Sequence, residues 1–260
     1  MTAAAAIRFY QVIGSVVTTA RRGLANLALP PICAGCEQDL ETPADAVPLC
    51  QACRRTFSTP AESICSRCAA PAPAASIRDD GCLHCRDTKF HFERILALGV
   101  YQGPLQAMIL RMKHASGESL AIAAGRLLAQ QIREVNWQPR PELVTAVPMH
   151  WTRRIASGNS AAALLAEAVA AELKLPLALD AVRTIRRVPR QSSLTPARRR
   201  HNMRSVFQVS AAYNLRDAHL LVLDDVFTTG ATANALARVL HRAGEATVSL
   251  GIVARGIGAH

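Results

Sequence analysis

The chain has 260 residues, of which 50% are hydrophobic and 19% are charged, and its formal net charge is +11. This hydrophobic content excludes a disordered or fibrous protein, and the length allows one domain of ordinary size plus a small module. The excess of positive charge favours a polyanionic partner, either nucleic acid or a multiply phosphorylated small molecule, and charge alone does not distinguish the two.

Residues 1–30 are predicted to form an N-terminal amphipathic helix that packs on the body of the protein. Their most apolar stretch, 9–20, is interrupted by Gln11 and is shorter than the ~20 residues that span a bilayer. The chain lacks an acid before Glu37, as transit peptides do, but it has neither a basic start nor a small-residue cleavage site. We therefore expect a cytoplasmic protein that does not contact the membrane.

The region 31–90 contains all the cysteines of the chain, arranged in Cys-x-x-Cys pairs. These pairs are Cys33 and Cys36, Cys50 and Cys53, Cys65 and Cys68, and Cys82 and Cys85. A two-residue spacer in a tight turn places two sulfurs on the same side of the chain, so two such turns complete a tetrahedron around Zn²⁺. We predict a double zinc-ribbon module with two structural zinc sites, each formed by consecutive pairs.

Three alternatives to this interpretation of the cysteines stay open. A cross-braced pairing of the four motifs would use the same eight residues. Disulfides would need an oxidising compartment, and a catalytic dithiol needs only one such motif. With zinc bound, a scaffolding role is favoured over direct contact with nucleic acid, since few large apolar side chains occur here and metal must replace the missing core.

Residues 91–260 alternate between strand and helix patterns. The spacing of apolar residues predicts strands over 95–101, 143–147, 207–209, 220–223 and 247–253, and helices over 104–112, 119–135, 160–173 and 233–242. Such alternation is typical of an α/β fold with a mainly parallel sheet and helices on both of its faces. We expect this region to form one domain after the cysteine module.

The segment from Leu220 to Thr232 joins a buried strand to a helix and is the most informative part of the sequence. In open α/β sheets such a loop lies where ligands bind, and the free amides and positive end of the helix favour an anion. Small residues let the backbone come close, and threonines add hydroxyl donors. The predicted phosphate-binding residues are Thr228, Thr229, Gly230, Ala231 and Thr232.

Two carboxylates, Asp224 and Asp225, directly precede this loop. They would repel a phosphate placed on them, so we expect them to face neutral hydroxyls of a ribose, or a Mg²⁺ ion that bridges ligand oxygens. The implied ligand carries phosphate at one end and hydroxyls at the other. An ordinary strand-to-helix turn is the structural alternative, and an ATPase loop is not expected because no Gly-Lys-Ser/Thr ending is present.

These residues resemble the ribose-phosphate signature of type I phosphoribosyltransferases, and the chain from Pro30 to Arg255 resembles the ComF family of competence-associated proteins. In that family a cysteine-rich zinc module precedes a phosphoribosyltransferase-like domain. The resemblance implies that Asp224 and Asp225 are the catalytic pair that holds the ribose hydroxyls of phosphoribosyl pyrophosphate (PRPP). It also implies that residues 228–232 hold the 5′-phosphate.

A second anion subsite is predicted after the strand over 143–147, because two strand ends can face one crevice. Arg153 offers a planar guanidinium there, and His150 is a weaker candidate. By resemblance this loop binds pyrophosphate, as does Lys113, which as plain chemistry is equally a solvated charge at a helix end. The family tends to read Arg-Gly-Phe-Asn-Gln where this chain has Ser-Gly-Asn-Ser-Ala at 157–161, which keeps the glycine and loses the arginine.

No acid occurs between Asp180 and Asp217, while arginines accumulate from Arg183 to Arg204. Prolines and serines interrupt any long helix here, so we predict a hood beside the ligand crevice. Three interpretations stay open: a solvated loop, a lid on a phosphorylated ligand, and a track for the phosphates of DNA or RNA, with single-stranded DNA as the candidate partner. Aromatic side chains for reading bases are scarce.

Two functions follow from these expectations. The first is Mg²⁺-dependent phosphoribosyl transfer, in which a nucleophile displaces pyrophosphate from C1 of the sugar, with Lys113 and Arg153 stabilising the leaving group. No residue accounts for an acceptor base. The second is a zinc-bearing, basic accessory protein of DNA uptake, whose pocket binds PRPP or a nucleotide as a regulatory ligand.

Overall fold

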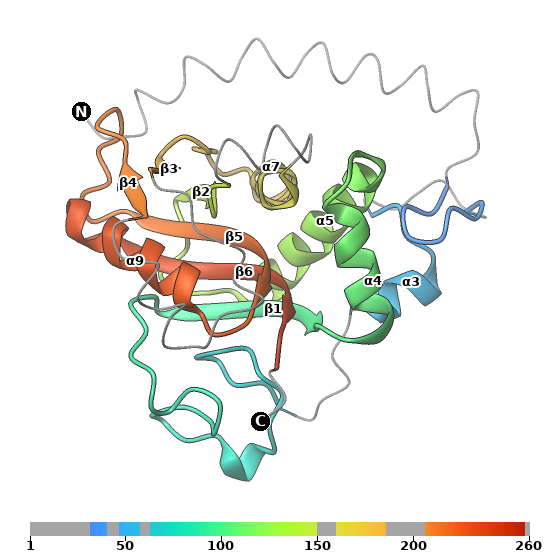
Figure 1. The fold of residues 1–260 in the computed structure, drawn as a ribbon, viewed down its shortest axis with the longest axis horizontal. Helices are drawn as coiled ribbons and strands as arrows, with labels where there is room; N and C mark the ends of the chain where they lie inside the picture. Colours follow the sequence, from blue (N-terminus) through green and yellow to red (C-terminus); the bar gives the residue numbers. More distant parts are fainter. Residues whose placement is uncertain (1–31, 41–46, 58–62, 150–159, 186–205, 258–260) are drawn as a thin grey trace.

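A four-stranded parallel sheet forms the centre of the protein (Figure 1). The computed structural model describes residues 32–40, 47–57, 63–149, 160–185 and 206–257. The strand order is β1-β6-β5-β2. The strands are β1 (Arg94–Val100), β2 (Leu143–Ala146), β5 (His219–Phe227) and β6 (Thr247–Arg255).

Three helices cover one face of this sheet: α4 (Gly103–Met112), α5 (Glu118–Val135) and α7 (Ala161–Leu173). The short 3₁₀ turn η2 (Ala115–Gly117) joins α4 to α5. The buried side chains of these helices share one core with Leu221 and Leu223 of β5. An apolar stripe at helical spacing against a buried strand explains this packing.

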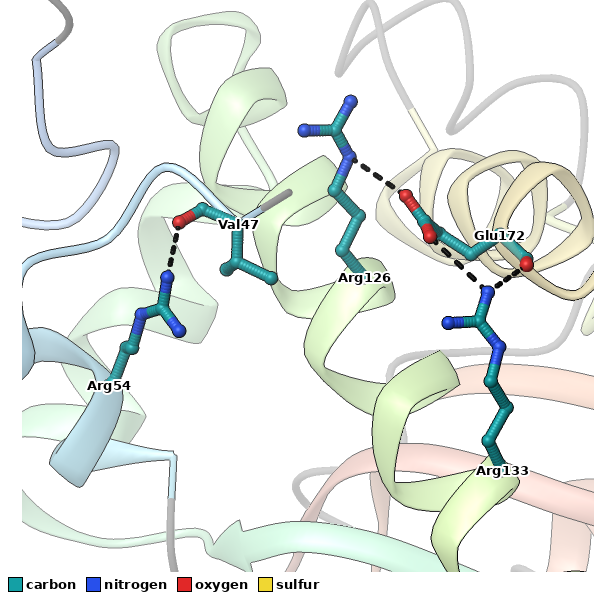
Figure 2. A network of polar contacts seen from close by, with 5 residues as sticks. All are labelled: Val47, Arg54, Arg126, Arg133 and Glu172. Atoms are coloured by element: carbon teal, nitrogen blue, oxygen red, sulfur yellow. Dashed lines mark hydrogen bonds and ion pairs between the residues drawn. The ribbon is translucent and has the colours of Figure 1, made fainter. Parts of the chain in front are cut away.

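Helices α5 and α7 lie against each other through a small residue and a pair of arginines. A Cβ at Gly125 would lie 2.7 Å from the Cβ of Ala168, so the glycine permits this close approach. Figure 2 shows Glu172 of α7 between Arg126 and Arg133 of α5, with N···O distances of 3.6 and 3.4 Å. These contacts fix α7 beside the sheet.

The opposite face of the sheet is covered by α9 (Ala231–Gly244), whose Leu236 and Leu240 share a second core with Leu220 and Val222. The antiparallel pair β3 (Val182–Thr184) and β4 (Phe207–Val209) contributes to the same core. Helices on both faces of a parallel sheet confirm the predicted fold class. Among the described residues, no helix combines the length and apolarity that a membrane span requires.

The cysteine-rich region forms two modules that join different cores. The first, residues 32–40 and 47–57, contains α3 (Gln51–Thr56) and belongs to the core of α4 and α5. Arg54 of α3 donates a 2.9 Å hydrogen bond to the carbonyl of Val47 (Figure 2). The second, residues 63–93, contains the 3₁₀ turn η1 (Ala74–Ser76) and belongs to the core of α9. Both modules therefore share apolar core with the body, in addition to any metal.

The strand predicted over 220–223 is longer in the structure. Strand β5 begins at His219 and ends at Phe227, and it pairs in register with β6 as far as the partners Phe227 and Arg255. Pairing with β6 extends the strand beyond its apolar run, because each added residue gains ladder hydrogen bonds. Asp224 and Asp225 consequently lie within the strand and not in the loop that follows it.

Some predictions fall on residues outside the described ranges. They are the helix over 1–30, the residues His150 and Arg153, and the part of the arginine-rich segment that spans 186–205. Arg183 is described, and its guanidinium donates to Oε1 of Gln208 across the β3–β4 pair.

Candidate functional site

The loop after β5 turns at Gly230, which precedes α9 with a φ of +73°. A Cβ on this residue would lie 2.6 Å from Cζ of Phe227 and 2.9 Å from Cε1 of Phe90. The left-handed conformation already disfavours other residues, and the two aromatic rings leave no room for a side chain. Gly230 is therefore required for the turn.

This loop leaves backbone donors unused at the amino end of α9. The helix has no side-chain cap, and within the described residues the N–H groups of Thr228, Thr229 and Thr232 have no backbone acceptor. The N–H of Ala231 reaches only Oγ1 of Thr229, at 3.4 Å. Free N–H groups at the positive end of a 14-residue helix are favourable partners for an anion.

The acid pair lies at the carboxyl end of β5, before this loop. Oδ1 of Asp224 accepts the N–H of Asp225 at 2.9 Å, and Oδ1 of Asp225 accepts the N–H of Val226 at 2.7 Å. Burial, and then the negative charge of Asp225, raise the pKa of Asp224 well above the usual carboxyl value. Ionised Asp224 is thus costly unless a hydroxyl donor or a cation contacts it.

Lys113 ends helix α4 and forms an ion pair with the acid pair. Its Nζ lies 2.9 Å from Oδ2 of Asp225. Burial lowers the pKa of Lys113, whereas the charge and hydrogen bond of Asp225, together with Tyr101 and Asp224, raise it, and the net shift is upward. Lys113 therefore remains a cation at the site, and without ligand its charge is directed to Asp225.

The eight cysteines form two clusters, Cys33 with Cys36, Cys50 and Cys53, and Cys65 with Cys68, Cys82 and Cys85, each with its sulfurs within 4.8 Å of one another. The Sγ–Sγ distances include 3.7 Å for Cys36 and Cys50 and 3.6 Å for Cys68 and Cys82. Zinc–sulfur bonds of about 2.3 Å in a tetrahedron give edges of about 3.8 Å. The geometry of both clusters fits Zn²⁺. Each cluster combines two consecutive Cys-x-x-Cys motifs, so the motifs are not cross-braced.

The electrostatics of the first cluster also call for a cation. Burial opposes ionisation of Cys33, but N–H groups, including those of Cys50 and Gly35 at 3.3 and 3.4 Å, lower the pKa of its thiol to about 6. Burial and the neighbouring sulfurs raise the pKa of Cys53. Four thiolates together therefore need a metal, and none of these cysteines forms a disulfide. The two clusters support structural Zn²⁺.

The structure brings the acid pair, Lys113 and the loop 228–232 to one edge of the sheet. The second anion subsite stays a prediction, because His150 and Arg153 lie outside the described residues. The start of that loop is held to β3, since Oγ1 of Thr184 donates to the Pro148 carbonyl at 2.9 Å.

Two residues of this region were missed by sequence reasoning. Asn234 of α9 bonds to the backbone of Lys89 and His91, and no local pattern signals this contact. Arg255 ends β6 beside Phe227 and is 5% exposed. A signal for Arg255 was present, since it is a charged residue at the end of an apolar strand pattern.

Family models match two parts of the chain. The double zinc ribbon domain matches residues 24–89, and the phosphoribosyl transferase domain matches residues 116–258. The chain is 27% identical over 200 residues to DNA utilization protein YhgH of Salmonella typhi, covering 74% of this chain and 84% of that protein. It is 23% identical over 238 residues to competence protein F of Haemophilus influenzae, covering 90% and 94%.

Solved structures that resemble this chain include an amidotransferase and a phosphoribosyltransferase. Glutamine PRPP amidotransferase from B. subtilis has a TM-score of 0.36 and 20% identity, and the match covers 52% of this chain and 26% of that one. Adenine phosphoribosyltransferase from Saccharomyces cerevisiae has a TM-score of 0.34 and 14% identity, with 58% and 72% covered.

The parallel sheet, the strand-to-helix loop and the domain match define a protein of the type I phosphoribosyltransferase fold that carries an N-terminal double zinc ribbon. Its full-length similarity to competence protein F and the order of its two domains show that the chain belongs to the ComF family.

Proposed function

We propose that this protein binds PRPP, or a related ribose phosphate, together with Mg²⁺, and serves in DNA uptake or nucleotide metabolism as a phosphoribosyltransferase-like component. The supporting observation is that hydrogen-bond donors and carboxylate acceptors lie next to each other at the carboxyl end of β5. Free N–H groups of the loop suit a phosphate, and the acid pair before it suits hydroxyls or a cation. A phosphorylated pentose presents both.

In this proposal each described residue has one task. The N–H and hydroxyl groups of residues 228–232 bind the 5′-phosphate, and Asp224 and Asp225 accept hydrogen bonds from the ribose hydroxyls. Ligand contacts also relieve the cost of ionised Asp224, whose pKa is raised by burial and by Asp225. Lys113, which is paired with Asp225 without ligand, would turn towards pyrophosphate.

Transfer of the phosphoribosyl group would follow from this binding. The bond from C1 of the ribose to the pyrophosphate oxygen breaks with its electron pair leaving on pyrophosphate, and the acceptor forms the new bond at C1. Charge neutralisation and positioning are the main requirements of such a step. Mg²⁺, held with the acid pair and the ligand oxygens, would supply charge neutralisation when bound, and Lys113 would stabilise the leaving group.

The test is a titration calorimetry series with PRPP in the presence and absence of Mg²⁺. We expect saturable binding to the wild-type protein, and a loss of about 10-fold or more in Asp224→Asn, as for a charge-assisted hydrogen bond. Asp217→Asn is the matched control, because Asp217 is exposed and faces only Arg216. Wild-type protein that binds no PRPP with Mg²⁺ would rule out the proposal.

Release of pyrophosphate from PRPP, measured with a panel of nucleobases, then separates the two functional hypotheses. Turnover that Asp224→Asn and Asp225→Asn abolish would identify an enzyme. Binding and thermal stabilisation without turnover would identify a ligand sensor.

Binding of single-stranded DNA is a second candidate function. It is favoured by the arginines between Arg183 and Arg204, by the net charge of +11 and by relatives named for DNA utilization and competence. Filter binding across a salt series should show an affinity that falls steeply with salt. An absent or salt-insensitive signal would remove this candidate. We also propose a cytoplasmic location, because cysteines that hold zinc as thiolates stay reduced there.

A further inference from the structure

Arg255 is a buried cation next to the phosphate-binding loop. It ends β6 in register with Phe227, the last residue of β5, and it is 5% exposed. Its guanidinium lies 5.1 Å from the ring centroid of Phe227. Among the described residues, no carboxylate forms an ion pair with it. A buried charge without a counterion is costly, so its retention needs a reason.

The guanidinium of Arg255 binds backbone carbonyls at the start of the loop. Nη1 donates to the carbonyl of Phe227 at 3.1 Å and also to those of Thr228 and Gly256. Across a trans peptide, the C=O of one residue and the N–H of the next point in opposite directions. Holding the carbonyls of Phe227 and Thr228 therefore turns the N–H groups of Thr228 and Thr229 away from Arg255.

Those two N–H groups are among the donors that have no backbone acceptor in the described structure. Arg255 thus orients the donors of the loop before any ligand arrives. The guanidinium also keeps unused capacity, because its Nε is buried and has no hydrogen-bond partner among the described residues. Neutral carbonyls compensate its charge only in part, which leaves positive potential behind the loop.

We propose that Arg255 is a positioning residue that fixes the phosphate-binding loop from behind and makes it selective for a doubly charged phosphomonoester. The identity of the ligand rests on the proposed function, whereas the effect on the loop does not. The chemistry predicts two separable effects. Orientation of the N–H donors needs the planar guanidinium of arginine, whereas electrostatic attraction of the phosphate needs only a positive charge.

The experiment compares Arg255→Lys and Arg255→Met with the wild-type protein. Arg140→Met is the control, because Arg140 is exposed and precedes the amino end of β2, away from the site. Amide hydrogen exchange of peptides covering 226–234, in which the end of β5 and the N–H of Asn234 are hydrogen-bonded, should become faster in both Arg255 variants without ligand. It should stay unchanged in the control.

Titration with ribose 5-phosphate and with ribose 5-sulfate, a singly charged analogue, tests the electrostatic part. We expect ribose 5-phosphate to bind about 10-fold more weakly to Arg255→Lys and about 100-fold more weakly to Arg255→Met, as for charged hydrogen bonds. The preference for phosphate over sulfate should survive in Arg255→Lys and fall in Arg255→Met. A purely structural role would weaken both ligands equally.

The outcomes separate this inference from the proposed function. Wild-type protein that binds neither PRPP nor ribose 5-phosphate would refute the proposed function, and the exchange data alone would then decide the role of Arg255. Unchanged exchange in both variants would overturn that role. Faster exchange with an unchanged phosphate-to-sulfate ratio would overturn the selectivity. If Arg255→Met fails to fold, Arg255→Lys still tests the effect on the loop. A complete loss of the preference for phosphate over sulfate in Arg255→Lys would contradict the electrostatic effect, because lysine keeps the positive charge.

Discussion

The ring of Phe90 meets the ring of Phe227 edge to face, with 5.9 Å between their centroids. Phe90 follows the second cysteine cluster, and Phe227 ends β5 directly before the loop 228–232. Phe92 stacks on Phe90 at 4.6 Å and also contacts Phe227. Because a Cβ at Gly230 would collide with both Phe90 and Phe227, these rings lie directly behind the turn.

The first cysteine cluster contacts a different part of the site. Arg111 of α4 donates to the carbonyl of Gly35 and forms a 2.8 Å ion pair with Glu37. Helix α4 ends at Lys113, which is paired with Asp225. The two clusters therefore support two sides of the candidate site: the first supports Lys113, and the second supports the loop 228–232.

Substitution of one cysteine in each cluster should separate these roles. Cys53→Ser and Cys85→Ser both remove a buried thiolate, and each should reduce the zinc content from two equivalents to one. Cys85→Ser should speed amide exchange over 226–234, and Cys53→Ser should speed it over α4. Metal analysis and exchange mass spectrometry measure both effects. Equal exchange patterns in the two variants would contradict separate support.

The contact between Asn234 and the segment after the second cluster gives another test. Nδ2 of Asn234 donates to the carbonyl of Lys89 at 3.0 Å, and its Oδ1 accepts the N–H of His91 at 2.6 Å. Asn234→Ala removes both bonds and should cost roughly 1–3 kcal/mol of unfolding free energy. Chemical denaturation measures this loss.

Asn214→Ala is the matched control for that substitution. Asn214 is exposed and accepts one hydrogen bond, from the N–H of Arg216 at 3.2 Å. Its removal should change the unfolding free energy by less than about 0.5 kcal/mol. A loss for Asn234→Ala no larger than this would show that the segment 89–91 is held by its aromatic contacts alone.

Two glycines with positive φ allow strain to be separated from collision. Gly230 has a φ of +73° and two aromatic rings beside it, whereas Gly103 has a φ of +53° and nothing within 4 Å of an added Cβ. Gly103→Ala should therefore cost only the strain, about 1 kcal/mol. Gly230→Ala should cost about 1–3 kcal/mol more, because the rings must move.

Thermal unfolding and ribose 5-phosphate titration measure this pair of variants. Only Gly230→Ala should also weaken the binding of the sugar phosphate, since only that turn forms the proposed site. Equal destabilisation by the two substitutions would mean that the rings yield without cost, and the argument for an obligatory glycine would fail.

The features that follow from local pattern were predictable from the sequence. Strand and helix periods gave the parallel α/β fold, and the spacing of the cysteines gave two metal clusters. What was missed depends on partners distant in the chain. The extension of β5 through Asp225 depends on pairing with β6. Asn234 contacts a segment more than 140 positions away in the chain. The role of Arg255 depends on its hydrogen bond to the carbonyl of Phe227 in another strand.

Asp224 provides a test in which the sign of a stability change depends on pH. Burial and the charge of Asp225 raise the pKa of Asp224 in the folded state. The folded chain thus holds this proton more tightly than the unfolded chain, so ionisation of Asp224 costs folding free energy. This cost is absent below the unfolded value of about 3.9, and it is complete above the folded pKa.

Asp224→Asn should therefore stabilise the ligand-free protein at pH 7.5, by roughly 1 kcal/mol or about 2–4 °C in Tm. The gain should disappear as the pH falls towards 4. Asp225→Asn should instead change the Tm little, because it removes the 2.9 Å partner of half-exposed Lys113 but also relieves the repulsion on ionised Asp224. Thermal scans of both variants against pH measure this. A lower Tm for Asp224→Asn at pH 7.5 would mean that the carboxylate is stabilised as an anion, so that the site would not need a hydroxyl or cation from its ligand.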